Sequence, residues 1–347
     1  MKKVLVVNRG RCDNLGDQAI NESMSSFIKS VYSYDVIFSE FTTLALKPKL
    51  IKLDVKSPRF KEHTRNFLKK ILPLKFLWLI RNSSRVRSAV SSKNDLIVVG
   101  GGQLILSNSS FDIAAATWVF FARWYKKKIV FCAVGAGISF SFVNKIFFHY
   151  ALKNCNGVCV RDASSKDTLK TIFNINSFVA GDIVFTDELF RSSTKGVVYL
   201  GIPALSVFQT YNEKVTRDEY YDIWLDFILK KDVNIGNCTL FFTTNEDYYE
   251  SVKFSLFLKI NHNIDIEIAQ TNSLITLKHY MKDAKLVISG RMHALIIAAN
   301  YSTDIIVFPI SNKLLDFQEM LEESSLELVD YKKTIKNKVE FFLNSWL

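Results

Sequence analysis

Cysteine is scarce in this 347-residue sequence, and the five cysteines are widely spaced. They are too few for a disulfide framework, and most of them occur among apolar residues, where a thiol packs as a small hydrophobic group. Cys155 and Cys159 form a C-x3-C pair, but no second pair or nearby histidine completes a zinc site. We therefore expect free thiols, no metal site and a reducing compartment.

Long apolar runs are also lacking. No run approaches the ~20 uncharged residues that a helix needs to span a bilayer. The first residues, MKKVLVVNRG, predict a strand and not a signal peptide. Apolar residues make up 48% of the sequence and charged residues 23%, as in soluble globular proteins. We expect a cytoplasmic protein whose length allows two domains.

The net charge of +11 is concentrated in one segment. Between residues 47 and 87, eight Lys and five Arg are accompanied by only two carboxylates, so this segment carries the whole excess. Within it, residues 66–87 interleave cations with Phe, Leu, Ile and Trp, a pattern that suits an anionic membrane surface. The alternative is a helical insert, at about 47–90, whose apolar side packs on its own domain. No recognised nucleic-acid-binding motif accompanies the charge, and we expect no nucleic acid partner.

Strand-like and helix-like stretches alternate along the whole sequence, which predicts parallel sheets with helices on their faces. The small polar residues at 190–196 indicate a linker. We predict an α/β protein with two Rossmann-like domains, at 1–190 and 196–347, whose mainly parallel sheets face a cleft. The last helical stretches, 313–322 and 330–345, either close the second domain or cross back to the first. The expected strands are 3–8, 35–41, 95–102, 128–135, 157–162, 176–184, 197–203, 238–244, 264–270, 285–290 and 304–309.

The stretch LVISGRMHALIIAANY, residues 286–301, places Arg291 and His293 between an apolar strand and an apolar helix. The carboxyl ends of parallel strands face the ligand crevice in α/β domains. The two side chains point the same way only if the backbone through them is extended, with the helix beginning at about His293. A helix N-terminus and an Arg side chain both favour a phosphate or carboxylate. In the alternative reading, Arg291 pairs with a neighbouring helix and His293 is a core imidazole.

Two further motifs follow strands of the first domain. In NLGDQAI (14–20), Gly16 permits a tight turn, and Asp17 either caps the helix or acts on a sugar hydroxyl. In VVGGGQLIL (98–106), Gly101 and Gly102 would let backbone amides approach a ligand closely.

Charged residues also end two later strands. VRDASS (160–165) places Arg161 at a strand end, and AGDIVF (180–185) does the same for Asp182. AVGAGISF (133–140) has Phe140 where a dinucleotide fingerprint requires a third Gly or an Ala, which argues against classical NAD binding.

In their order, NLGDQAI, GGGQLI, VRDASS, AGDIVF and SGRMHALIIAA resemble the motifs of the polysaccharide pyruvyl transferase family, over roughly residues 1–315. The resemblance implies two Rossmann-like domains of the GT-B type. It also implies transfer of pyruvate from phosphoenolpyruvate to two hydroxyls of a sugar, in an exopolysaccharide or cell-surface glycan, as a ketal. Arg161, Arg291 and His293 would surround the donor. Lys313 falls where the family has a Lys, although PISNKLLDF departs from the family's Tyr-Asp-Pro-Lys pattern.

This reaction requires a general acid and cations that hold a multiply charged donor. We assign His293 as the acid, Arg291 and Arg161 to the carboxylate and phosphate, and Asp17 to acceptor orientation or base catalysis. The other expected substrate-binding residues are Ser289, Asn14, Gly101, Gly102, Asp182 and Lys313.

We expect no cofactor and no metal, with phosphoenolpyruvate as donor and a saccharide, free or lipid-linked, as acceptor. The first domain would hold the acceptor and the second the donor. A lipid-linked acceptor would place the protein at the inner face of the cytoplasmic membrane, held there by residues 66–87. The alternatives are a GT-B-type glycosyltransferase that uses a nucleotide sugar, and a non-catalytic, membrane-recruited component of polysaccharide assembly.

Overall fold

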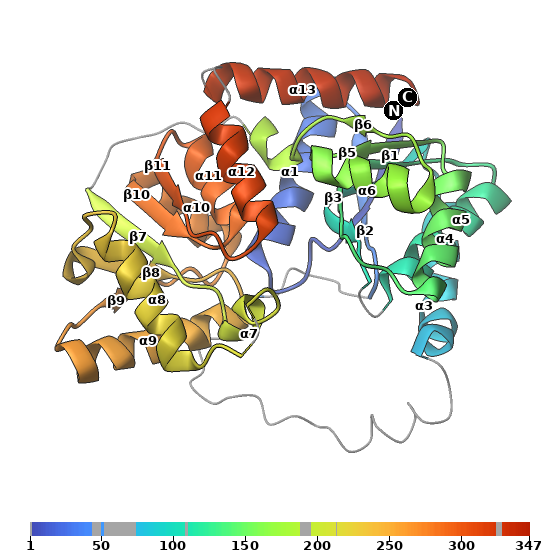
Figure 1. Cartoon of the computed structure of the whole chain (residues 1–347). Coiled ribbons are helices and arrows are strands. Elements are labelled where there is room, and N and C mark those ends of the chain that lie inside the picture. The colour runs from blue at the N-terminus through green and yellow to red at the C-terminus, as the bar shows by residue number, and fades with distance from the viewer. Residues whose placement is uncertain are drawn as a thin grey trace.

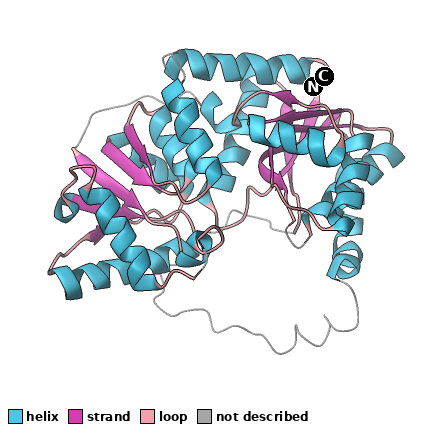
Figure 2. Cartoon of the chain, viewed as in Figure 1, coloured by secondary structure: helices cyan, strands magenta, loops and turns pink. Residues whose placement is uncertain are grey.

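The computed structural model of the chain describes residues 2–43, 50–51, 74–107, 110–187, 196–212, 214–323 and 328–347. Within these residues the chain forms two parallel sheets with helices packed around them (Figures 1 and 2). The predicted α/β class and alternation of strands and helices are confirmed.

The first sheet has the strand order β2-β1-β3-β4-β5-β6, and all neighbouring strands are parallel. Its strands are β1 (Lys3–Asn8), β2 (Asp35–Glu40), β3 (Leu96–Ile105), β4 (Lys128–Ala136), β5 (Gly157–Val160) and β6 (Phe178–Val179). The helices that accompany it are α1 (Leu15–Tyr32), α3 (Leu74–Ser91), α4 (Phe111–Trp124), α5 (Phe142–Asn154), α6 (Ala163–Phe173) and the 3-10 helix η1 (Ile183–Thr186).

The second sheet has the order β11-β10-β7-β8-β9 and is also parallel. Its strands are β7 (Val197–Gly201), β8 (Cys238–Phe241), β9 (Glu267–Ile268), β10 (Ala284–Ser289) and β11 (Asp304–Val307). The remaining helices are α7 (Leu205–Phe208), α8 (Arg217–Leu229), η2 (Ile235–Asn237), α9 (Asn245–His262), α10 (Leu274–Asp283), α11 (Met292–Asn300), α12 (Asn312–Glu323) and α13 (Leu328–Asn344).

The apolar run in β1 is buried on both faces of the first sheet. Successive strand residues point to opposite faces, so Val4 and Val6 join the core that contains α1, whereas Leu5 and Val7 join the core that contains α4. Helices on both faces explain why this strand has no polar alternation. The core around α1 continues into the second domain.

The last helix, α13, runs back from the second domain to the first (Figure 1). It packs against η1, and the Tyr32 hydroxyl donates to the carbonyl of Glu340 at 3.1 Å. The amine of Lys2 donates to the carbonyl of Leu347 at 2.8 Å. The two ends of the chain therefore lie side by side on the first domain.

Helix α1 also joins the two sheets. The amide of Leu15 donates to the carbonyl of Thr243 at 2.9 Å, which ties the start of α1 to the loop after β8. Lys278 of α10 pairs with Glu22 of α1 at 2.8 Å and with Asp187 at 3.2 Å. These contacts hold α1 of the first domain against the loop after β8 and against α10 of the second.

Two predicted strands are much shorter in the structure. The strand expected at 264–270 spans only Glu267–Ile268. The strand expected at 176–184 pairs only over Phe178–Val179, because Gly181 has a φ of 117° and Asp182 then caps η1. Of the basic stretch 66–87, residues 66–73 lie outside the described residues, and the rest belongs to α3.

One side of α3 packs on its own domain, as the alternative reading expected. Trp78 and Val86 are buried there, whereas Phe76 and Ile80 are exposed on the opposite side. Among the described helices, none has the length and low charge that a membrane span requires.

Candidate functional site

A cavity of about 250 Å³ lies where the carboxyl ends of the two sheets meet. The residues that line it follow strand ends in both domains, as expected for a ligand site in an α/β fold. The polar or charged ones include Arg9 and Asp17 after β1, Arg161 after β5, Thr243 after β8, and Arg291 and His293 after β10.

Arg291 is the N-cap residue of α11 and has an extended backbone, with φ −110° and ψ 101°. The helix begins at Met292, one residue before the predicted start. Beneath it, the Ser289 hydroxyl accepts from the Arg291 amide at 3.0 Å and donates to the carbonyl of Gly201 at 2.9 Å. Ser289 is fully buried and is not among the residues that line the cavity. Its hydroxyl holds the turn between β10 and α11.

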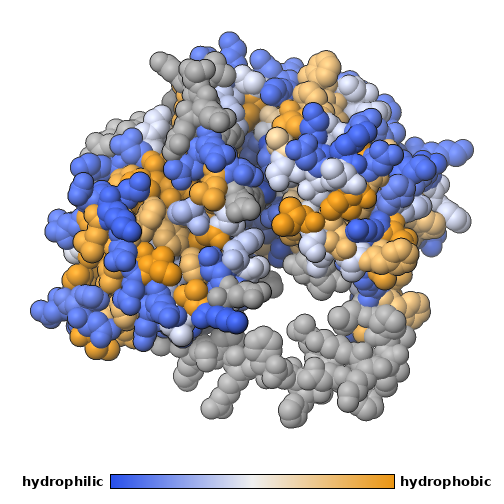
Figure 3. All heavy atoms as spheres, viewed as in Figure 1, coloured by the Kyte–Doolittle hydropathy of each residue, from blue (hydrophilic) through white to orange (hydrophobic). Residues whose placement is uncertain are grey.

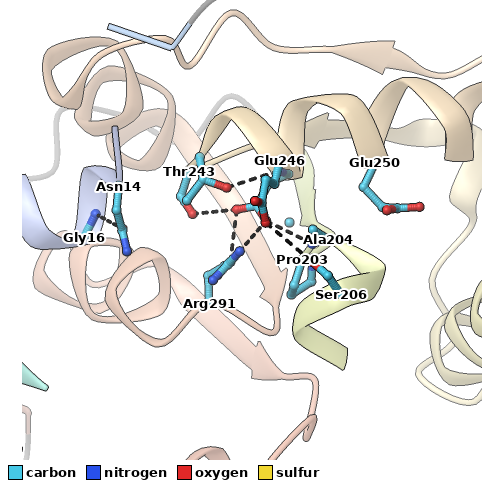
Figure 4. Close-up of polar contacts among 12 residues, drawn as sticks. Asn14, Gly16, Pro203, Ala204, Ser206, Thr243, Glu246, Glu250 and Arg291 are labelled. Carbon is cyan, nitrogen blue, oxygen red and sulfur yellow. Dashed lines mark hydrogen bonds and ion pairs between the residues drawn. The ribbon is translucent and has the colours of Figure 1, made fainter. Parts of the chain in front are cut away.

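The guanidinium of Arg291 forms a two-pronged ion pair with Asp247 of α9. Its Nε donates to one carboxylate oxygen at 3.0 Å, and its Nη2 donates to the other (Figure 4). Burial would lower the pKa of Arg291, but the charge and hydrogen bonds of Asp247 outweigh it and raise that pKa. The edge formed by Nε and Nη2 therefore faces Asp247, and the two N–H groups of Nη1 with the second N–H of Nη2 are left for a ligand in the cavity.

Asp247 is itself held in place by the protein. It accepts from the amide of Ala204 at 2.9 Å and from the hydroxyl of Thr243 at 2.9 Å, and Figure 4 shows Thr243 and Ala204 on either side of this contact. Because the carboxylate is buried and fully engaged, Arg291 is fixed before any ligand arrives. The sequence reasoning did not find Asp247.

His293 and Arg161 share a buried carboxylate. His293 Nε2 lies 3.3 Å from Asp182 Oδ2, and Arg161 Nη1 lies 3.5 Å from the same oxygen. Burial would raise the pKa of Asp182, but His293, Arg161 and the Val184 amide together hold it well below its usual range. Asp182, predicted as a substrate-binding residue, lies behind the two cavity side chains and supports them; its own side chain is 6% exposed and is not among the residues that line the cavity.

Two glycines make room for these side chains. A Cβ on Gly16 would lie 2.9 Å from Nδ1 of His293, so a larger residue would separate the N-termini of α1 and α11. A Cβ on Gly135 would lie 2.7 Å from Nε of Arg161. Such distances are shorter than van der Waals contacts. The position of His293 therefore explains why residue 16 is a glycine, and the position of Arg161 explains the same for residue 135.

Asn14, Asp17 and Arg9 line the first-domain side of the cavity. Asn14 is the N-cap of α1, and its side chain accepts from the Gly16 amide at 2.9 Å. Asp17 lies 3.6 Å from Nη1 of Arg9 and accepts from the Cys12 thiol at 3.3 Å. Arg9 was not predicted, although it follows a strand end just as Arg161 does.

Gly101 and Gly102, predicted to let backbone amides approach a ligand, lie outside the lining of this cavity. They have φ angles of 73° and 71° and lie beneath α1, where a Cβ on Gly101 would come within 1.9 Å of Ile20. Lys313 lies in the first turn of α12, and its side chain is outside the part of the structure that is described.

The cavity is suited to a small anion with more than one charged group. Arg9, Arg161, Arg291 and His293 line it, and the N-terminus of α11 adds amides without acceptors in its own helix. Each of these four side chains has a carboxylate beside it that orients it, so little reorganisation is required when an anion binds.

Comparisons with known proteins agree with the fold described above. The structure is similar to UDP-GlcNAc 2-epimerase from Methanocaldococcus jannaschii, with 12% identity, coverage of 99% of this chain and 100% of that one, and a TM-score of 0.50. It is also similar to the S. aureus MnaA–UDP co-structure, with 10% identity, coverage of 99% and 88%, and a TM-score of 0.50. At these identities the likeness shows a shared GT-B-like fold.

No curated protein matches the sequence. A family model described as polysaccharide pyruvyl transferase matches residues 14–312, which include every cavity residue discussed above except Arg9. The chain belongs to the polysaccharide pyruvyl transferase family.

Proposed function

We propose that the protein transfers pyruvate from phosphoenolpyruvate to two hydroxyls of a sugar as a ketal and releases phosphate. The observation that carries this proposal is the placement of His293, as a candidate acid, in one cavity with the buried Arg161 and the half-buried Arg291, in a chain from this family. Phosphoenolpyruvate has a phosphate and a carboxylate within one small molecule, and the cavity provides cations for both.

The donor would be held by Arg161 and Arg291. Arg161 is 6% exposed and lies against the first sheet, whereas Arg291 belongs to the second. One anionic group can contact each guanidinium, while the open amides at the start of α11 can bind phosphate oxygens. The donor would therefore be oriented between the domains.

His293 would supply the proton. Its Nε2 faces Asp182, so its Nδ1, which lies beside Gly16, is the nitrogen left to act on the donor. The buried carboxylate of Asp182 beside Nε2 fixes the orientation of the ring. General acid catalysis of this kind typically contributes about 10²- to 10⁴-fold in rate.

The chemistry proceeds in two steps. His293 protonates the methylene carbon of phosphoenolpyruvate, and the neighbouring carbon, now electron-poor, is attacked by one sugar hydroxyl, which loses its proton. A second hydroxyl of the same sugar then attacks this carbon, loses its proton, and displaces phosphate with the electrons of the broken C–O bond. The arginines stabilise the charge on the leaving phosphate.

The acceptor would approach from the first domain. Asp17 lines the cavity there and has a side chain that is 17% exposed. Its ion pair with Arg9 keeps it oriented, so it can accept a hydrogen bond from a sugar hydroxyl or take its proton. A lipid-linked saccharide is one of the acceptors that this arrangement allows.

The test is a reaction of the protein with phosphoenolpyruvate and a panel of aryl glycosides, with phosphate release and ketal formation followed by colorimetry and mass spectrometry. Formation of a pyruvyl ketal supports the proposal. Sugar transfer from a UDP-sugar to the same glycosides, without any reaction of phosphoenolpyruvate, would favour the nucleotide-sugar alternative instead.

A further inference from the structure

The outer face of the first domain combines exposed apolar and basic side chains. It is formed by α3, α4 and α5, with α4 packed against the other two, on the side of the first sheet remote from the second sheet (Figure 1). Exposed large apolar residues occur on each helix: Phe76 and Ile80 on α3, Phe120 and Trp124 on α4, and Phe142, Val143 and Ile146 on α5. We call this surface the basic apolar face.

Apolar side chains of all three helices meet at one groove on this face. A groove of about 440 Å³ runs between the three helices and is lined by Leu79, Phe120, Ile146 and Tyr150, among others. The rings of Phe120 and Trp124 lie 5.9 Å apart. In Figure 3, apolar residues on this side of the molecule lie among hydrophilic ones. Exposed patches of this kind mark interaction surfaces.

The face has cations but no exposed carboxylate. Within the three helices the single acidic residue is Asp112, which is fully buried and is bound by Lys75 and Asn144. The exposed cations are Arg81, Arg87, Arg123, Lys145 and Lys153. The patch therefore has an uncompensated positive charge.

We propose that the basic apolar face docks on an anionic membrane surface. Aromatic and aliphatic side chains would enter the interfacial region, and the surrounding cations would contact anionic head groups. A second copy of the chain fits poorly, because a symmetric contact would oppose like charges. This proposal goes beyond the pyruvyl transfer and does not rest on it, since it uses no residue of the cavity.

The experiment is flotation of the full chain with two kinds of vesicle, phosphatidylcholine alone and phosphatidylcholine mixed with phosphatidylglycerol. Wild-type protein should float with the anionic vesicles only. The double substitution Arg123→Ala with Lys145→Ala should weaken binding by about fivefold for each cation removed. Trp124→Ala with Phe142→Ala should weaken it by at least about tenfold, because two large apolar groups are lost.

A matched control is Ile260→Ala on α9, because Ile260 and Phe142 are both 78% exposed. This variant should float like the wild type. All of these side chains project into solvent, so circular dichroism and melting temperature should be unchanged. The proposal is overturned if wild-type protein fails to float with anionic vesicles, or if the two face variants float as well as the Ile260→Ala control. A dimer that the face variants dissociate, seen by light scattering, would overturn it in favour of a second copy.

Discussion

The substitution Asp182→Asn tests the role of the buried carboxylate behind His293. The amide has nearly the same shape and can still accept from the Val184 amide, as the carboxylate does at 3.1 Å, so the fold is expected to persist. The change removes the negative charge 3.3 Å from His293 Nε2. Without this charge, the imidazole of His293 loses the carboxylate that orients it, and Arg161 loses the same partner.

The size of the effect follows from distance and burial. At 3.3 Å, Coulomb's law gives about 5 kcal/mol for an effective dielectric constant near 20. Arg161 competes for the same oxygen at 3.5 Å, and the His293 side chain is 16% exposed, so the net effect is smaller. Hydrogen bonds to charged groups contribute about 1.5 to 3 kcal/mol, so we expect turnover to fall by roughly 10- to 150-fold.

The assay is phosphate release from phosphoenolpyruvate across pH, with a glycoside that the wild-type protein accepts. Turnover should fall by about that factor across the pH range in which the wild-type protein is active, while donor affinity stays within a few fold. Asp167→Asn, on the exposed side of α6, is the matched control and should leave the profile unchanged. Wild-type turnover in folded Asp182→Asn protein would show that Asp182 does not position His293 for catalysis.

Three further predictions concern the site and its surroundings. His293→Ala should reduce turnover by about 10²-fold or more and leave phosphoenolpyruvate binding measurable by calorimetry; turnover within tenfold of wild type would remove His293 from the acid role. Gly135→Ala should displace the Arg161 guanidinium and raise the KM for phosphoenolpyruvate, since the new Cβ would lie 2.7 Å from Nε; an unchanged KM would show that Arg161 does not bind the donor. Burial raises the pKa of Glu40 to about 7, so its ionisation opposes folding as pH rises from about 4.5 to 7. Glu40→Gln should therefore raise stability by about 1 to 3 kcal/mol at pH 8 but not at pH 4, and equal melting shifts at both values would contradict this.

Much of the architecture follows from local sequence patterns. Strands such as 3–8 are continuous apolar runs because both faces of a parallel sheet are covered, and helices such as 163–173 have clear start and stop signals. The strand expected at 176–184 failed where a left-handed glycine and a capping Asp outweighed strand propensity. Strand propensity, a glycine turn and a helix cap compete within a few residues here. Which of them prevails depends on contacts with the rest of the chain.

At the site, too, some features could be predicted from local sequence and others could not. Strand-end reasoning found Arg161, Arg291 and His293 because their position depends on short-range order. Its alternative reading, that Arg291 pairs with a neighbouring helix, is confirmed by the contact with Asp247 of α9, but the partner itself was not identified because the two residues are 44 positions apart. It also assigned Gly101 to ligand approach, whereas its actual neighbour is Ile20. Partners that are distant in sequence are set by tertiary packing, which local patterns do not record.

The donor assignment is best tested by calorimetric titration of phosphoenolpyruvate into the wild-type protein and into Arg291→Lys at low salt, with UDP as the comparison ligand. We expect saturable binding of phosphoenolpyruvate that is clearly weaker in Arg291→Lys, because a Lys point charge cannot hold Asp247 and a ligand together as the guanidinium does. Equal affinity in the two proteins, or saturable binding of UDP with none of phosphoenolpyruvate, would contradict the assignment.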